Sequence, residues 1–189
     1  MAVVSIKNKL RRGNLLAGND PYIPTDFESI ATVTVGSGGS SSITFSSISS
    51  DFTHLQIRGW ASSASTPRIY IRYNSDSGSN YTYHFLEGNG SSAVASAGAN
   101  QAENWLFING FIAANNPAPF VIDILDYKDT NKFKTMRALH GNDNNSAGYI
   151  SLASGLWRST SAISSIELRT NTSTFSQYST FALYGIKGA

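Results

Sequence analysis

The stretch FTHLQIRGW, Phe52 to Trp60, alternates apolar and polar side chains, and this alternation decides the fold class. In an extended chain successive side chains point to opposite faces, so Leu55 and Ile57 fall on one face and the polar residues between them on the other. The pattern therefore predicts a β-strand with one buried face and one face in water.

Short runs of the same kind recur along most of the chain, separated by clusters of Gly, Ser, Asn and Asp that favour turns. No window of helical length shows a 3.6-residue apolar period. We therefore expect an all-β fold, an antiparallel two-sheet β-sandwich of jelly-roll type, and not a parallel sheet with crossover helices. The expected strands are 29–35, 43–48, 52–60, 68–73, 81–86, 105–108, 120–127, 133–140, 149–157, 163–170 and 180–187.

Two connections between these strands are expected to be irregular or tightly turned. The segment from Glu87 to Ala102 is rich in Gly, Ser and Ala, and we expect it to form the longest loop. The dipeptide Asn109-Gly110 favours a type I′ hairpin turn, because both central residues of that turn need a positive φ. Phe111 and Ile112 would then begin the returning strand.

The first 24 residues, MAVVSIKNKLRRGNLLAGNDPYIP, differ in composition from the rest of the chain. Their four basic side chains, all within positions 1–12, precede the first acid, Asp20, whereas residues 13–189 carry 10 basic against 12 acidic side chains. Pro21 and Pro24 favour extended backbone. We expect an extended basic arm over residues 1–24 that docks on a larger assembly, followed by one β-sandwich domain over residues 25–189. The arm residues expected to contact the partner are Val4, Ile6, Lys7, Lys9, Leu10, Arg11, Arg12, Leu15, Leu16 and Tyr22.

Composition limits the other classes of partner. The chain has no cysteine, so it has neither a disulfide framework nor thiolate chemistry. It contains no apolar run of membrane-spanning length and no signal-peptide pattern at its beginning. The body carries no excess of basic residues. We therefore expect neither a nucleic-acid nor a membrane partner.

Catalytic and metal-binding patterns are weak. Three aspartates, Asp123, Asp126 and Asp129, form the densest acidic group, and we interpret them as solvated carboxylates near a strand end, not as a hydrolytic pair. The three histidines are each isolated within a strand pattern; they are His54, His84 and His140. We expect no enzyme activity, cofactor or metal.

Two polar loops and the tryptophans leave other possibilities open. Residues 74–80 and 142–145 offer oxygen ligands of the kind that calcium prefers, but Asn and Asp in such positions more often stabilise turns. Trp60, Trp105 and Trp157 could form a platform for sugar rings if they lay exposed in one groove, although large aromatic residues are more often buried in the core.

Several segments carry a resemblance to a known group of proteins. The chain resembles small virion-associated proteins of tailed bacteriophages and prophages, and it is especially similar to versions from marine and cyanobacterial phages. The segments are SIKNKLRRGNLLAGN (Ser5 to Asn19), VTVGSGGSSSITFSSI (Val33 to Ile48), LQIRG (Leu55 to Gly59), YHFLEGNGSSA (Tyr83 to Ala93), SGLWRSTSAISSIEL (Ser154 to Leu168) and YSTFALYGIKG (Tyr178 to Gly188).

The resemblance implies a structural protein of the virion, assembled in the cytoplasm of the bacterial host. We expect a capsid decoration, or cement, protein that docks on the major capsid protein or another virion component, as a homotrimer suited to three-fold lattice positions. The alternative is a tail-fibre, tail-tip or head-fibre protein whose loops Glu87 to Ala102 and Asn142 to Ala147 bind a host surface glycan. A glycan-processing enzyme built on Asp123 and Asp126 is the third and least supported hypothesis.

Overall fold

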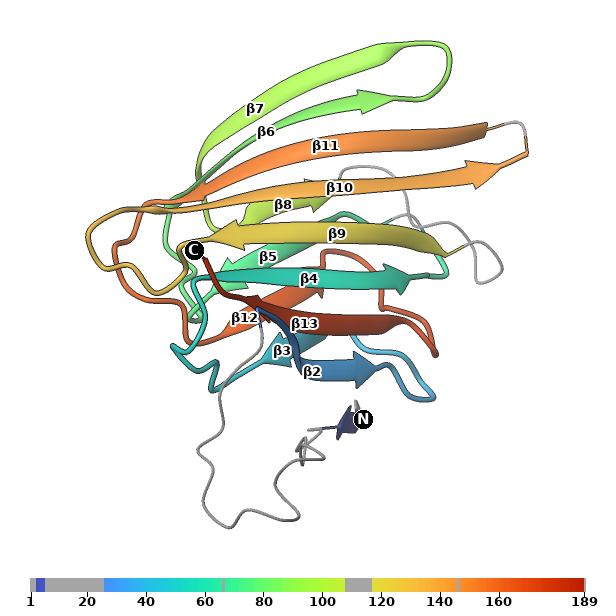
Figure 1. The fold of residues 1–189 in the computed structure, drawn as a ribbon. Coiled ribbons are helices and arrows are strands. Elements are labelled where there is room, and N and C mark those ends of the chain that lie inside the picture. The colour runs from blue at the N-terminus through green and yellow to red at the C-terminus, as the bar shows by residue number, and fades with distance from the viewer. Residues whose placement is uncertain (1–2, 6–25, 66, 108–116, 146, 189) are drawn as a thin grey trace.

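The computed structural model describes residues 3–5, 26–65, 67–107, 117–145 and 147–188. These residues form two antiparallel β-sheets and no helix (Figure 1), and hence no helix that could cross a membrane. The predicted all-β, two-sheet sandwich is confirmed.

The larger sheet has nine strands and the smaller has four. In spatial order the larger sheet contains β1 (Val3–Ser5), β2 (Phe27–Thr34), β13 (Thr180–Ile186), β4 (His54–Ala61), β9 (Ala118–Leu125), β10 (Lys134–Asn144), β11 (Ala147–Trp157), β6 (Tyr81–Gly88) and β7 (Ala93–Gln101). The smaller sheet contains β3 (Ser42–Phe45), β12 (Ile166–Thr170), β5 (Ile69–Tyr73) and β8 (Asn104–Phe107).

One hydrophobic core lies between the two sheets. Leu55 and Ile57 of β4 are fully buried, as the alternation in FTHLQIRGW predicts, and Ile71 of β5 and Ile166 of β12 reach the same core from the smaller sheet. Burying apolar side chains from both sheets stabilises the sandwich by about 25 cal/mol per Å² removed from water. The core thus determines which face of each central strand points inward.

Four strands of the larger sheet extend beyond the smaller one. The hairpins β6–β7 and β10–β11 lie side by side and reach past β8 and β5 (Figure 1). We call their extended parts, residues 84–97, 137–145 and 147–154, the projection. β7 forms one edge of the sheet, and its side chains are exposed or half-exposed along the whole strand.

The projection corrects two predictions. The expected loop from Glu87 to Ala102 is mostly strand β7, because the backbone of β6 supplies a hydrogen-bonding partner that its Ala- and Ser-rich sequence does not signal. The turn itself is short, since the Asn89 Oδ1 atom accepts hydrogen bonds from the backbone N–H groups of Ser91 and Ser92. The expected loop from Asn142 to Ala147 is likewise wrong, because β10 and β11 remain paired up to Asn144 and Ala147.

Other predictions fall on residues outside those described. These are the Asn109-Gly110 turn, the return at Phe111 and Ile112, and almost all of the N-terminal arm. Within the arm, the backbone of β1 pairs with β2, and Val4 lies opposite Val33.

Candidate interaction surface

The outer face of the projection, which points away from the smaller sheet, carries an unusual apolar row. Strand register places five apolar side chains directly opposite one another on neighbouring strands. The exposed fractions of Leu86, Leu152 and Leu139 are 54%, 51% and 45%. We call this set the outer row; in order from β7 to β9 it contains Ala95, Leu86, Leu152, Leu139 and Val121.

A second set of residues lies beside the outer row, displaced by two residues along each strand toward the hairpin tips. Ile150 is 63% exposed, and its neighbours across the strands are small. We call this set the second row; it contains Ala93, Gly88, Ile150 and Gly141. A shallow hollow of about 540 Å³ lies along the outer row and is bounded in part by Arg137.

The inner face of the projection buries polar side chains, whereas the outer face exposes apolar ones. Glu87, Ser151 and His140 lie opposite one another on β6, β11 and β10, and all three are buried. Burial disfavours the charged imidazolium and lowers the pKa of His140 from 6.5 to about 4. Sequence reasoning missed this polar row, because only the register brings the three residues together.

The projection carries few charged residues. β7 and β11 contain no charged residue. On the outer face of β10, Arg137 lies two residues before Leu139, and Asp143 lies two residues after Gly141, and both charged side chains are exposed. The apolar rows are therefore flanked by Arg137 and, opposite it on β9, Asp123 on one side, and by Asp143 on the other side. A contiguous apolar surface with a polar rim is characteristic of a protein–protein contact.

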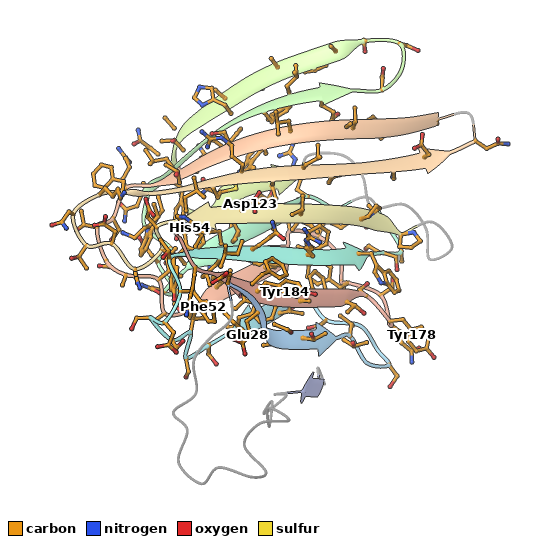
Figure 2. All side chains as sticks on the ribbon, viewed as in Figure 1. Glu28, Phe52, His54, Asp123, Tyr178 and Tyr184 are labelled. Atoms are coloured by element: carbon orange, nitrogen blue, oxygen red, sulfur yellow. The ribbon has the colours of Figure 1, made fainter. Side chains whose placement is uncertain are left out.

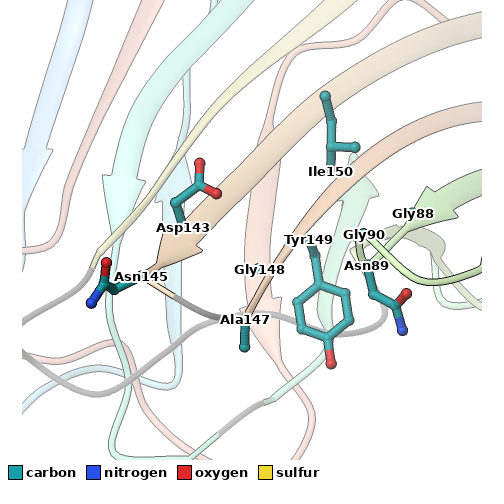
Figure 3. A pocket seen from close by; sticks show the side chains of 9 residues that line it. All are labelled: Gly88, Asn89, Gly90, Asp143, Asn145, Ala147, Gly148, Tyr149 and Ile150. Atoms are coloured by element: carbon teal, nitrogen blue, oxygen red, sulfur yellow. The ribbon is translucent and has the colours of Figure 1, made fainter.

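The tips of the two hairpins enclose a separate, more polar hollow of about 480 Å³ (Figure 3). Tyr149 of β11 contributes an aromatic ring, Asp143 near the end of β10 contributes a carboxylate, and Asn145 in the β10–β11 turn contributes an amide group. Asn89 lines the opposite side, although its side-chain oxygen already accepts hydrogen bonds within its own turn. A hollow lined by an aromatic ring, a carboxylate and amide groups is suited to bind a sugar.

The three aspartates of the β9 region are each held by a neighbouring side chain, and two of them share one lysine. Asp123 accepts a hydrogen bond of 2.6 Å from the Gln56 side chain, and Asp126 lies 2.5 Å from the Lys132 Nζ atom. Asp129 also pairs with Lys132, at 3.5 Å. The backbone N–H of Asn131, followed by Lys132, lowers the pKa of Asp129 below its usual value. Asp126 and Asp129 thus share one cation, whereas Asp123 is held by Gln56 of the neighbouring strand β4.

The three histidines are dispersed over the sheet. His54 begins β4 (labelled in Figure 2), and its Nδ1 atom accepts a hydrogen bond from the backbone N–H of Asp126. His84 is exposed on the outer face of β6, whereas His140 is buried. Among the described residues, no group of three or more His, Asp or Glu side chains could hold a metal ion.

The segment 74–80 is a hydrogen-bonded turn. The Asp76 carboxylate accepts hydrogen bonds from the Trp157 indole, the Asn80 side chain and the Gly78 backbone. Burial raises the pKa of Asp76, but the hydrogen bonds from these three donors outweigh it, so the net pKa is lowered. This is the turn chemistry that the sequence favoured over a calcium site. Asp76 also anchors Trp157, which is buried.

The tryptophans do not share one groove. Trp157 is buried, Trp105 stacks on Tyr83 with ring centroids 4.5 Å apart, and Trp60 is exposed on the outer face of β4. Their separation removes the platform of several tryptophans that the sugar-binding alternative would have used.

The arm residues expected to contact a partner lie outside the described residues, except for the backbone of Val4. Their role stays a prediction. They are Val4, Ile6, Lys7, Lys9, Leu10, Arg11, Arg12, Leu15, Leu16 and Tyr22.

No family model and no curated protein matches the sequence. Among solved structures, the crystal structure of the botulinum neurotoxin serotype G binding domain is similar at 12% sequence identity and a TM-score of 0.23. The alignment covers 100% of this chain and 44% of that one, so the chain spans less than half the length of the structure it matches. A likeness at this level carries no argument about function.

Proposed function

We propose that the chain is a structural protein of a phage virion that works while held against other proteins. The observation that supports this best is the exposed apolar outer row on a projection with few charges. A surface of this kind is unfavourable on an isolated soluble protein and favourable in an assembly, where contact with another protein removes it from water.

Within this class, we propose a capsid decoration protein whose N-terminal arm docks on the major capsid protein. The resemblance to virion-associated proteins supports this assignment, and the arm combines two kinds of contact. Its four basic side chains would orient the arm on an acidic surface, and its interleaved aliphatic side chains would supply most of the buried area. Binding that requires the assembled shell stabilises that shell by mass action.

Deleting residues 1–20 is expected to abolish incorporation into phage heads while the β-sandwich remains folded. The measurement is the copy number of the protein per purified head, together with the thermal stability of the heads. A matched variant replaces only Lys7, Lys9, Arg11 and Arg12 with glutamine and is expected to incorporate weakly, with a stronger dependence on salt. Full incorporation of the deletion variant would refute the docking role of the arm.

The polar hollow at the hairpin tips supports a second candidate, a tail-fibre, tail-tip or head-fibre protein that binds a host surface glycan. Under this alternative, replacing Tyr149 with alanine is expected to weaken binding to host cells or lipopolysaccharide about 10-fold, because a stacked sugar ring loses its aromatic partner. Tyr178→Ala, at an exposed tyrosine outside the hollow, is the control. Absence of binding by the native protein at micromolar concentration would exclude this alternative.

A further inference from the structure

We propose that the outer face of the projection binds the same face of a second copy of this chain, in a two-fold symmetric pair. This inference goes beyond the proposed function, since the pair forms without any virion partner. It depends on the shape, charge and area of the outer face.

The first argument is shape. The proposed two-fold axis lies in the contact plane, perpendicular to the strands, midway between the outer row and the second row. Rotation about this axis places β10 of one copy against β10 of the other, with the strand directions reversed. Leu139 of one copy then lies over Gly141 of the other, and Leu86 lies over Gly88, because each pair is separated by two residues along its strand.

The remaining positions of the two rows match in the same way. Leu152 lies over Ile150 of the other copy, and Ala95 lies over Ala93. Two of the four positions thus place a leucine against a glycine, and the other two place residues of similar size against each other. Packed sheets interdigitate their side chains in this manner, at a separation of about 10 Å.

The second argument is charge. The same axis places Arg137 of each copy over Asp143 of the other, because the two residues are equally distant from it along β10. The arrangement therefore places two identical Arg137–Asp143 pairs at the rim of the apolar contact, each beside Asp123, which lies opposite Arg137 on β9 of the same copy. Between these rims the face carries no charge on β7 or β11 that would repel its own copy.

The third argument is area. The four strands of the projection, β7, β6, β11 and β10, span about 19 Å across the sheet, and their projecting parts extend for about 17 to 27 Å. The face therefore offers about 400 Å² per copy, half of the roughly 800 Å² per partner of a standard protein–protein interface. An area of this size fits a weak pair that forms at high protein concentration.

The test uses the full-length protein and measures its mass by light scattering and sedimentation. At about 100 µM we expect twice the 20.3 kDa of one chain. Leu152→Glu, at an exposed position on the outer row, is expected to weaken the pair about 100-fold, because it buries an unpaired carboxylate. Tyr178→Glu, at an exposed position away from the projection (labelled in Figure 2), is expected to leave the mass unchanged.

A charge exchange tests the geometry separately from the apolar contact. Arg137→Asp and Asp143→Arg are each expected to weaken the pair about 10-fold, whereas the double variant is expected to recover most of the native affinity. Circular dichroism verifies that each variant is folded.

Three results would overturn the proposal: a mass of one chain at the highest concentration, a mass of three chains, or a pair of unchanged affinity in Leu152→Glu and in the charge variants. A mass of three chains would support the homotrimer expected from the sequence. None of these results depends on incorporation into heads, so the pair and the virion assignment can fail independently.

Discussion

Acidification from pH 7 to pH 4 is expected to lower the free energy of unfolding by about 3 kcal/mol through His140 alone. Burial lowers the pKa of this residue from 6.5 to about 4. Between these two values the unfolded chain binds a proton that the folded protein does not bind. Stability therefore falls as the pH falls through this range, and the contribution of His140 becomes constant below about pH 4.

Among the described residues, the cross-strand neighbours of His140 are uncharged. Ser151 lies opposite it on β11 and Phe120 lies opposite it on β9, and neither carries a charge. Glu87 occupies the same inner row two strands away, at a distance of about 10 Å by strand spacing. Desolvation is therefore the main cause of the lowered pKa.

Urea unfolding at several pH values between 4 and 7 measures this effect. His140→Gln is expected to have a flatter pH dependence than the native protein, whatever its absolute stability. His84→Gln, at an exposed histidine, is the control and is expected to retain the native slope. Carboxylates such as Asp76 titrate in all three proteins, so they cancel in the comparison. Parallel curves for His140→Gln and the native protein would contradict the prediction.

Replacing Gly59 with alanine is expected to destabilise the fold by about 3 kcal/mol, although alanine is the better residue for an ordinary strand. Gly59 lies in β4 between Phe120 of β9 and Phe181 of β13. The two aromatic rings approach across it, with centroids 5.7 Å apart. An added Cβ atom would lie 2.3 Å from the backbone oxygen of Thr180 and 2.9 Å from the Phe120 ring.

A backbone carbonyl in the middle of the sheet cannot move aside without breaking its hydrogen bonds, which is why we expect a large effect. For a chain of this size, the melting temperature should fall by about 6 to 12 °C. Gly88→Ala is the matched control, because its Cβ atom would have no neighbour nearer than 3.8 Å. If both glycine variants had the melting temperature of the native protein, the proposed steric cause would be wrong.

Sequence patterns predicted most strands because their residues are β-branched or aromatic and alternate in polarity. Leu55 and Ile57 show this clearly, since both their strand and their buried face were expected. β7 was missed because its Ala, Ser and Gly residues have little intrinsic preference for a strand and pair only through the backbone of β6. Local preference could not reveal a pairing that tertiary structure imposes.

The candidate surface was harder to predict than the fold. Alternation shows that Leu139 and His140 lie on opposite faces, but it does not show which face is covered. An apolar residue would ordinarily be assigned to the core, yet Leu139 is exposed and His140 is buried, so at this level of β10 the covered face is the one that carries the histidine. The arm, by contrast, was predicted from composition alone, and its docking role stays a prediction.

The two long strands β10 and β11 connect a region whose backbone amides are protected from solvent exchange with a region whose amides are less protected. One end of each strand lies in the core, where Met136 and Trp157 are buried, and the other end lies in the projection. Backbone amides near the core should exchange with solvent only on global unfolding, whereas amides near the hairpin tips should exchange through local opening. A single strand can therefore fray at its tip while its other end remains folded, which allows the outer face to adapt to a bound surface without loss of the sandwich.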